Sequence, residues 1–162
     1  MTGSTLNAYL DIEASFEGDI TVIGIYYAGC KLIQLADDRV DYPNLLDAIE
    51  RGTMILTYNG SRFDLPVIRA KTGIDLTKHR FCRDLMYDCW RHNLYGGLKK
   101  VENILGIKRE AKEIAGYGAM LLWDRYRKYS DLEALNALLQ YNRDDTINLH
   151  TLHKRLDALD RK

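Results

Sequence analysis

The sequence predicts an α/β fold in which a mixed sheet of five to six strands is flanked by helices. Three observations indicate this fold. Strand patterns crowd the first third of the chain, strands and helices alternate in the middle, and amphipathic helices fill the remainder. With 162 residues, of which 46% are apolar, the chain is long enough to bury a full hydrophobic core. We therefore expect one domain over residues 1–162.

The first third of the chain contains three strand patterns. Apolar runs rich in Ile, Val and Tyr predict strands at 7–13, 19–27 and 30–35. The short loops between them contain Gly18 and Gly29, which are typical turn residues. These three strands are expected to form a meander.

Helices and strands alternate after the meander. The predicted elements are, in chain order, a helix at 42–50, a strand at 53–60, a helix from about Pro66 to Gly73, a strand at 79–85, and helices near 84–93, at 98–106, at 117–128 and from about residue 131. Ser130 and Glu133 form a predicted capping box for the last and longest helix.

Charge and cysteine content narrow the class of protein. Lys plus Arg and Asp plus Glu both number 23, so a polyanionic partner would have to be bound by a local basic patch or by cations. The three cysteines lack the spacing of a disulfide framework or a zinc knuckle, which predicts a reducing, cytoplasmic location. No secretory signal is visible and no apolar run approaches the roughly 18 residues of a membrane span, so no membrane partner is expected.

Two acids occupy the first predicted strand. Strand side chains alternate between faces, so Asp11 and Glu13 point to the same side. Two like charges on a half-buried face need a positive partner between them. The alternative is a solvent-facing edge, where the pair would cost little.

The last helix carries another acid within its apolar stripe. Steps of three or four residues give the stripe Leu138, Tyr141, Asp145, Leu149, Leu152, Leu156 and Leu159. Tyr141 lies one turn before Asp145, on the same face. The alternative for Asp145 is a partly exposed acid paired with Arg143 or a lysine. Asp144 is rotated by about 100° and is interpreted as a surface charge.

Asp64 is the fourth acid of interest. It stands just before Pro66, where a helix N-cap is the simplest interpretation. It also follows the end of a buried strand, where open α/β sheets usually bind ligands. Acidic oxygens without His or Cys companions suit Mg²⁺ or Mn²⁺, and several acids in one site need about two such ions. The four acids therefore predict a two-ion site that could hydrolyse a phosphodiester.

Three motifs, LDIEAS, YNGSRFD and YNRDD, appear in this order. With them the chain resembles the DEDD superfamily of 3′-to-5′ exonucleases, which have a ribonuclease H-like fold. The Tyr141 to Asp145 spacing resembles the tyrosine subclass (DEDDy). The segments between the motifs are similar to a predicted exonuclease group related to the proofreading domains of family-B DNA polymerases.

The resemblance implies roles for individual residues. Asp11, Glu13 and Asp145 would bind the first metal, Asp11 and Asp64 the second, and Tyr141 would orient the attacking water. Four residues are candidates for substrate contact, with an ordinary core or turn role equally open: Leu10, Ile12, Asn59 and Phe63.

The implied enzyme removes nucleoside 5′-monophosphates from the 3′ end of single-stranded DNA or RNA, with protein partners for targeting. Two alternatives stay open: a catalytically silent nucleic-acid-binding or protein-interaction module, and a nuclease that cuts internally. Basic residues at 78–83, 91–92, 99–100 and 125–128 could guide a strand or form solvated helix faces. Asp84 is interpreted as a cap or a support for the site, and His150 and His153 as surface residues.

Overall fold

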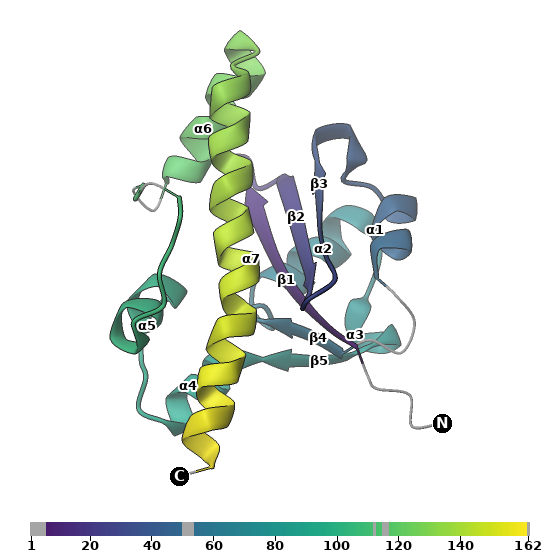
Figure 1. Ribbon diagram of the computed structural model, residues 1–162. Helices are drawn as coiled ribbons and strands as arrows, with labels where there is room; N and C mark the ends of the chain where they lie inside the picture. Colours follow the sequence, from purple (N-terminus) through teal and green to yellow (C-terminus); the bar gives the residue numbers. More distant parts are fainter. Residues whose placement is uncertain (1–5, 50–53, 112, 115–116, 162) are drawn as a thin grey trace.

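A computed structural model of the protein describes residues 6–49, 54–111, 113–114 and 117–161. In this part of the chain five strands form one sheet in the order β3-β2-β1-β4-β5 (Figure 1). The strands are β1 (Asn7–Ala14), β2 (Ile20–Tyr27), β3 (Lys31–Ala36), β4 (Met54–Thr57) and β5 (Phe81–Asp84). β1 pairs antiparallel with β2 and parallel with β4, which confirms the mixed sheet.

Seven α-helices and one 3₁₀ helix accompany the sheet in the described residues. They are η1 (Asp37–Arg39), α1 (Tyr42–Ala48), α2 (Asp64–Thr72), α3 (Leu76–His79), α4 (Leu85–Arg91), α5 (Leu98–Leu105), α6 (Gly118–Tyr129) and α7 (Leu132–Asp160). The predicted helix at 42–50 and strand at 53–60 each reach into residues 50–53, which lie outside the described residues. The short η1 and α3 were not predicted. None of the described helices is both long and apolar enough to cross a membrane.

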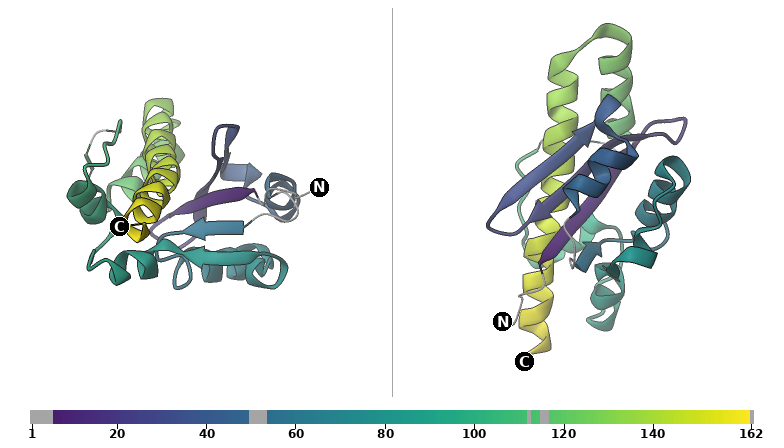
Figure 2. Two further views of the ribbon diagram at one scale, coloured as in Figure 1. Left: turned by 60° about the horizontal axis from the view of Figure 1, so that its bottom comes forward. Right: turned by 90° about the vertical axis from the view of Figure 1, so that its right-hand side faces the viewer.

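The helices cover the two faces of the sheet. α1, α2 and α3 lie on one face, whereas α7 crosses the other face with α4, α5 and α6 beside it (Figures 1 and 2). β1 supplies both cores by alternation: Leu10 and Ile12 pack toward α1 to α3, and Tyr9 packs toward α7. Asp11 and Glu13 share the face of Tyr9, so the fold places both acids under α7.

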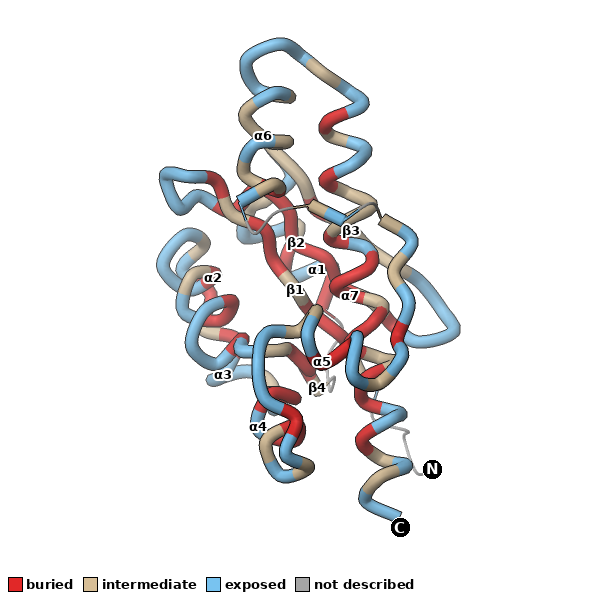
Figure 3. The backbone as a smooth tube through the Cα atoms, turned by 90° about the vertical axis from the view of Figure 1, so that its left-hand side faces the viewer, coloured by how far each residue is buried: buried red, intermediate tan, exposed pale blue. Residues whose placement is uncertain are grey.

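Gly24 allows α7 to approach the sheet closely. It lies on β2 directly opposite Asp11. A Cβ atom at this position would lie 2.3 Å from Oγ1 of Thr146 and 2.4 Å from Oδ1 of Asn142, both on α7. A glycine inside a strand often marks such an approach. Buried positions concentrate in β1, β2 and β4 and in the middle of α7 (Figure 3).

The predicted capping box at the start of α7 is wrong. Ser130 has a left-handed backbone (φ 52°) and ends α6, so it cannot cap the next helix. Asp131 caps α7 instead, and its carboxylate accepts a hydrogen bond from the amide of Ala134 at 3.0 Å. The N-cap of α7 is therefore Asp131, one residue later than the sequence predicted.

Candidate functional site

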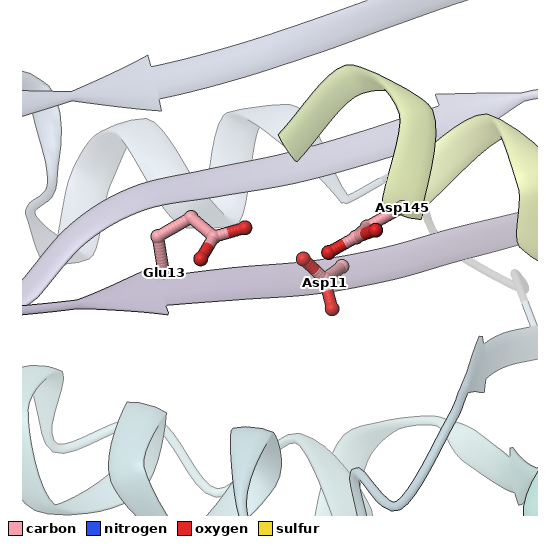
Figure 4. A group of neighbouring side chains, drawn as sticks. All are labelled: Asp11, Glu13 and Asp145. Carbon is pink, nitrogen blue, oxygen red and sulfur yellow. The ribbon is translucent and has the colours of Figure 1, made fainter. Parts of the chain in front are cut away.

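Three carboxylates meet between β1 and α7. Each of Asp11, Glu13 and Asp145 offers one oxygen that lies within 4.8 Å of the oxygens offered by the other two. Figure 4 shows Asp11 and Glu13 standing on β1 while Asp145 reaches toward Asp11 from α7. We call this group the acidic cluster. Strand alternation brings the first two together, and the close approach of α7 over Gly24 adds the third.

The acidic cluster is electrostatically strained as it stands. Burial raises the pKa of Asp11 and of Glu13 well above the ordinary range, and the charge of Asp145 raises both further. Burial also raises the pKa of Asp145 to about 6, against the opposing effect of Arg109. A cation at the centre of the acidic cluster would reduce the repulsion and lower the pKa of all three carboxyl groups.

The donor set fits a hard divalent cation. All three ligand atoms are carboxylate oxygens, which Mg²⁺ and Mn²⁺ prefer. Glu13 adds a second observation, because its Oε1 is buried and has no hydrogen-bond partner within the described part of the chain. Buried polar atoms in folded proteins nearly always have a partner, so this oxygen is available to a cation.

Asp64 lies beside the acidic cluster but outside its 4.8 Å limit. It is the first residue of α2, which begins before the predicted start at Pro66, and its side chain does not cap that helix. Its Oδ1 instead accepts a hydrogen bond from the amide of Ile12 on β1 at 3.0 Å. The side chain is only 4% exposed, and burial raises its pKa to about 7. The N-cap interpretation is therefore wrong.

Asp84 supports the turn that leads into Asp64. Its Oδ1 accepts from the amide of Asn59 at 2.8 Å, and its Oδ2 accepts from the amide and the hydroxyl of Ser61 at 3.1 and 2.7 Å. It also caps α4 through the amide of Met86. These contacts confirm the predicted role as cap and support. The left-handed Asn59 (φ 58°) shapes the same turn.

Asn142 connects the acidic cluster to α7 and the meander. Its amide nitrogen donates to Oδ2 of Asp11 at 3.1 Å, and its Oδ1 accepts from the side-chain amide of Gln34 on β3 at 3.0 Å. Gln34 also donates to the carbonyl of Leu139. The fully buried Asn142, held by Gln34, fixes the orientation of the Asp11 carboxylate.

Arg109 provides a positive charge next to the acidic cluster. It lies on the connector between α5 and α6 and forms an ion pair with Asp145. Its Nη1 also donates to both carboxylate oxygens of Glu102, at 3.0 and 2.8 Å. Glu102 is fully buried on α5 and accepts a further hydrogen bond from Asn148 on α7 at 2.9 Å. Glu102 and Asn148 thus hold the guanidinium in place.

Asp144 is buried, so its interpretation as a surface charge is wrong. The side chain is 6% exposed, and its Oδ2 accepts from the amides of Glu110 and Ala111 at 2.9 and 2.6 Å. The segment after α5 lies beside α7 (Figure 1), and its residues Glu110 and Ala111 cover the side of Asp144 that a helix alone would expose. Asp144 and Asp145 therefore hold the same connector, one through its backbone and one through Arg109.

Tyr141 lies one turn from Asp145 on the same side of α7, as the spacing predicted. Burial and the charges of Asp145 and Glu13 raise the pKa of its phenol above the usual range. Two cations face the ring: Nζ of Lys99 lies 4.4 Å and the guanidinium carbon of Arg109 lies 5.4 Å from the ring centre.

Other predicted residues lie as follows. Leu10 and Ile12 are buried in the core on the opposite face of the sheet, whereas Phe63 is 46% exposed next to Asp64. The prediction that both histidines are on the surface is wrong for His153, which is buried and shares a hydrogen bond with the phenol of Tyr9 at 2.9 Å. His153 lies between α7 and the sheet because α7 packs closely against β1 there.

Sequence reasoning missed Arg109, Glu102, Asn142 and Asn148. Two of them carry a signal that is visible in the sequence, because asparagine is a poor residue for a helix interior unless its side chain has a partner. Arg109 and Glu102 carry no comparable signal. Their meeting depends on how the connector folds back onto α7.

Comparison with known families agrees with this geometry. A family model described as the RNase_H superfamily matches residues 8–157, which includes nearly all of the sheet and of α7. No curated protein matches the chain. The family match and the acidic cluster together indicate a nuclease, an enzyme that hydrolyses nucleic acid with divalent metal ions. Since the match covers most of its length, the chain belongs to the RNase_H superfamily.

Proposed function

We propose that the protein is a metal-dependent 3′-to-5′ exonuclease that acts on single-stranded DNA or RNA and releases nucleoside 5′-monophosphates. The observation that carries the proposal is the acidic cluster, in which the half-buried Asp11 and the buried Glu13 and Asp145 converge without enough positive charge from the chain to balance them. Tyr141 on the same helix turn adds the pattern of the tyrosine subclass of DEDD exonucleases.

The geometry of the acidic cluster supports the first set of ligands, and the resemblance to DEDD exonucleases supports the second. Asp11, Glu13 and Asp145 would hold one Mg²⁺ or Mn²⁺ ion, and Asp11 with Asp64 would hold a second on the side of α2. Two such ions, when bound, activate a water molecule and neutralise charge on the leaving oxygen. Asn142 and the amide of Ile12 keep two of these carboxylates in fixed orientations, so little rearrangement is needed.

Tyr141 would orient the attacking water. Its raised pKa keeps the phenol protonated near neutral pH. It therefore exchanges hydrogen bonds with the water and does not act as the base that removes a proton. The carboxylate of Asp145, one turn away, would help to orient the same water.

The test uses three substrates with the purified protein and Mg²⁺ or Mn²⁺: a 5′-labelled DNA strand, the matched RNA strand, and a circular single-stranded DNA. The expected result is stepwise shortening of the linear strands from the 3′ end, release of 5′-monophosphates, and an intact circle. Asp11→Ala must abolish the activity, because a contaminating nuclease would not respond to this change.

Two results would overturn the proposal. Cutting of the circle would show a nuclease that acts internally. If a folded protein binds the linear strands but leaves them intact with either metal, it is a catalytically silent binding module.

A further inference from the structure

A basic cavity opens beside the acidic cluster. Its volume is about 520 Å³, within the range of sites that hold small ligands. Tyr141 forms one wall, and α5 with the connector after it forms the rest. The charged residues that line it are Lys99, Lys108, Arg109 and Glu113. Arg109 is already paired with Glu102 and Asp145, so Lys99 and Lys108 against Glu113 leave the cavity with an excess of positive charge that suits an anion.

Lys99 faces the acidic cluster from this cavity. Its ammonium lies 4.4 Å from the centre of the Tyr141 ring, and its charge lowers the pKa of Glu13 and of Asp145. Within the described residues Lys99 forms no ion pair, although it is only partly exposed. Arg109 differs, because Glu102 and Asp145 already occupy its guanidinium.

The charges around the site leave Lys99 without a counterion in the proposed metal-bound state. Four acids form the proposed metal site and Glu102 pairs with Arg109 beside it, whereas backbone amides of Glu110 and Ala111 bind the neighbouring Asp144. Two divalent ions and Arg109 balance the charges of the four acids and Glu102. The negative charge of a bound phosphodiester then remains, and Lys99 is a cation beside Tyr141 that could meet it.

We propose that the basic cavity binds the sugar-phosphate backbone next to the scissile bond and that Lys99 is its phosphate ligand. This inference rests on the proposed exonuclease function and specifies where the strand lies relative to the acidic cluster. Tyr141, which forms the wall between cavity and cluster, then borders both the bound strand and the attacking water.

The test measures strand binding separately from cleavage. A 5′-fluorescein oligothymidylate is titrated with protein in Ca²⁺ at several KCl concentrations, and a gel confirms that the strand stays intact. Lys99→Gln should weaken binding about tenfold, which is typical of losing one charge-assisted contact. It should also reduce the slope of log K against log salt by about 0.7, the value for one phosphate contact on a single strand.

Lys100→Gln is the matched control. Lys100 follows on the same helix, is exposed and does not line the cavity, so its variant should change affinity less than about twofold. A second comparison replaces the linkage that precedes the 3′-terminal one, and therefore lies next to the scissile bond, with an uncharged methylphosphonate. Lys99→Gln should not weaken binding of that strand, because the charge that Lys99 contacts is gone.

The possible results separate this inference from the proposed function. Equal losses for Lys99→Gln and Lys100→Gln, or no loss for either, in a protein that cleaves linear strands refute the inference alone. Binding that depends on Lys99 in a protein that never cleaves refutes the exonuclease alone. A protein that neither binds nor cleaves strands refutes both.

Discussion

Asp64→Asn tests whether the site stores unfavourable charge. The amide keeps an oxygen that can accept the hydrogen bond from the Ile12 amide, now 3.0 Å from Oδ1, and it removes only the charge. The wild-type carboxyl has its pKa raised by burial from 3.8 to about 7. Asparagine does not ionise, so the folded variant does not carry the free-energy cost of an ionised carboxylate at this buried position.

The size and sign of the effect follow from this pKa gap. Because the folded protein holds the proton more tightly than the unfolded chain, its stability falls as pH rises from 3.8 to about 7 and then stays constant. A gap of about 3 units corresponds to about 4 kcal/mol at 1.36 kcal/mol per unit. We expect Asp64→Asn to raise the free energy of unfolding by about 4 kcal/mol at pH 8 and by almost nothing at pH 4.

Urea unfolding in EDTA, followed by circular dichroism between pH 4 and pH 8, measures the difference. Asp38→Asn is the control, because Asp38 is exposed on η1 and its variant should stay within about 0.5 kcal/mol of wild type. With Mn²⁺ the difference in free energy of unfolding between Asp64→Asn and wild type should shrink or change sign, since metal binding stabilises the wild-type protein, which keeps all four acids, more than the variant. A variant that is no more stable than wild type at pH 8 in EDTA would refute the argument.

Three further substitutions test the geometry. Gly24→Ala should lower the free energy of unfolding by about 2–3 kcal/mol in urea, because its methyl group would lie 2.3 Å from Oγ1 of Thr146; wild-type stability would contradict the close approach of α7. Tyr141→Phe should reduce the cleavage rate about 100-fold without changing stability, and a decrease below tenfold in a gel assay would remove the water-orienting role. Asp84→Ala should destabilise by about 2 kcal/mol by leaving the turn amides and Ser61 without an acceptor, whereas Asp84→Asn should cost less; equal stabilities of these two variants would show that the turn does not depend on that oxygen.

Periodicity predicted the parts of the site that lie on regular elements. The alternation of β1 gave the shared face of Asp11 and Glu13, and the stripe of α7 gave Tyr141 and Asp145. These rules describe one element at a time. They correctly placed side chains on a face, but they left open which other element would cover it.

The error at Asp144 and the failure to find Arg109 occur where an irregular segment covers a regular one. Asp144 points away from the sheet, as the helix period requires, but the connector after α5 covers it there. Arg109 on that connector has no period from which its position could be inferred. The fully buried Glu102 shows the same limit, since its presence on α5 is explained only by the arginine that folds back onto it.

The charge arrangement links folding to the proposed chemistry. Close approach of α7 over Gly24 brings Asp145 to Asp11 and Glu13, and this raises the pKa of both β1 acids. The chain offsets part of the repulsion with Arg109, but this guanidinium also pairs with Glu102. An isolated carboxylate cluster of this kind lowers the stability of the folded protein, so the packing that creates it must be stabilised elsewhere, by the two cores on either side of the sheet. Divalent ions would then bind to a site whose ligands are already assembled and whose repulsion they relieve. Metal affinity and metal-dependent stability should therefore rise together as pH increases through the raised pKa values of these acids.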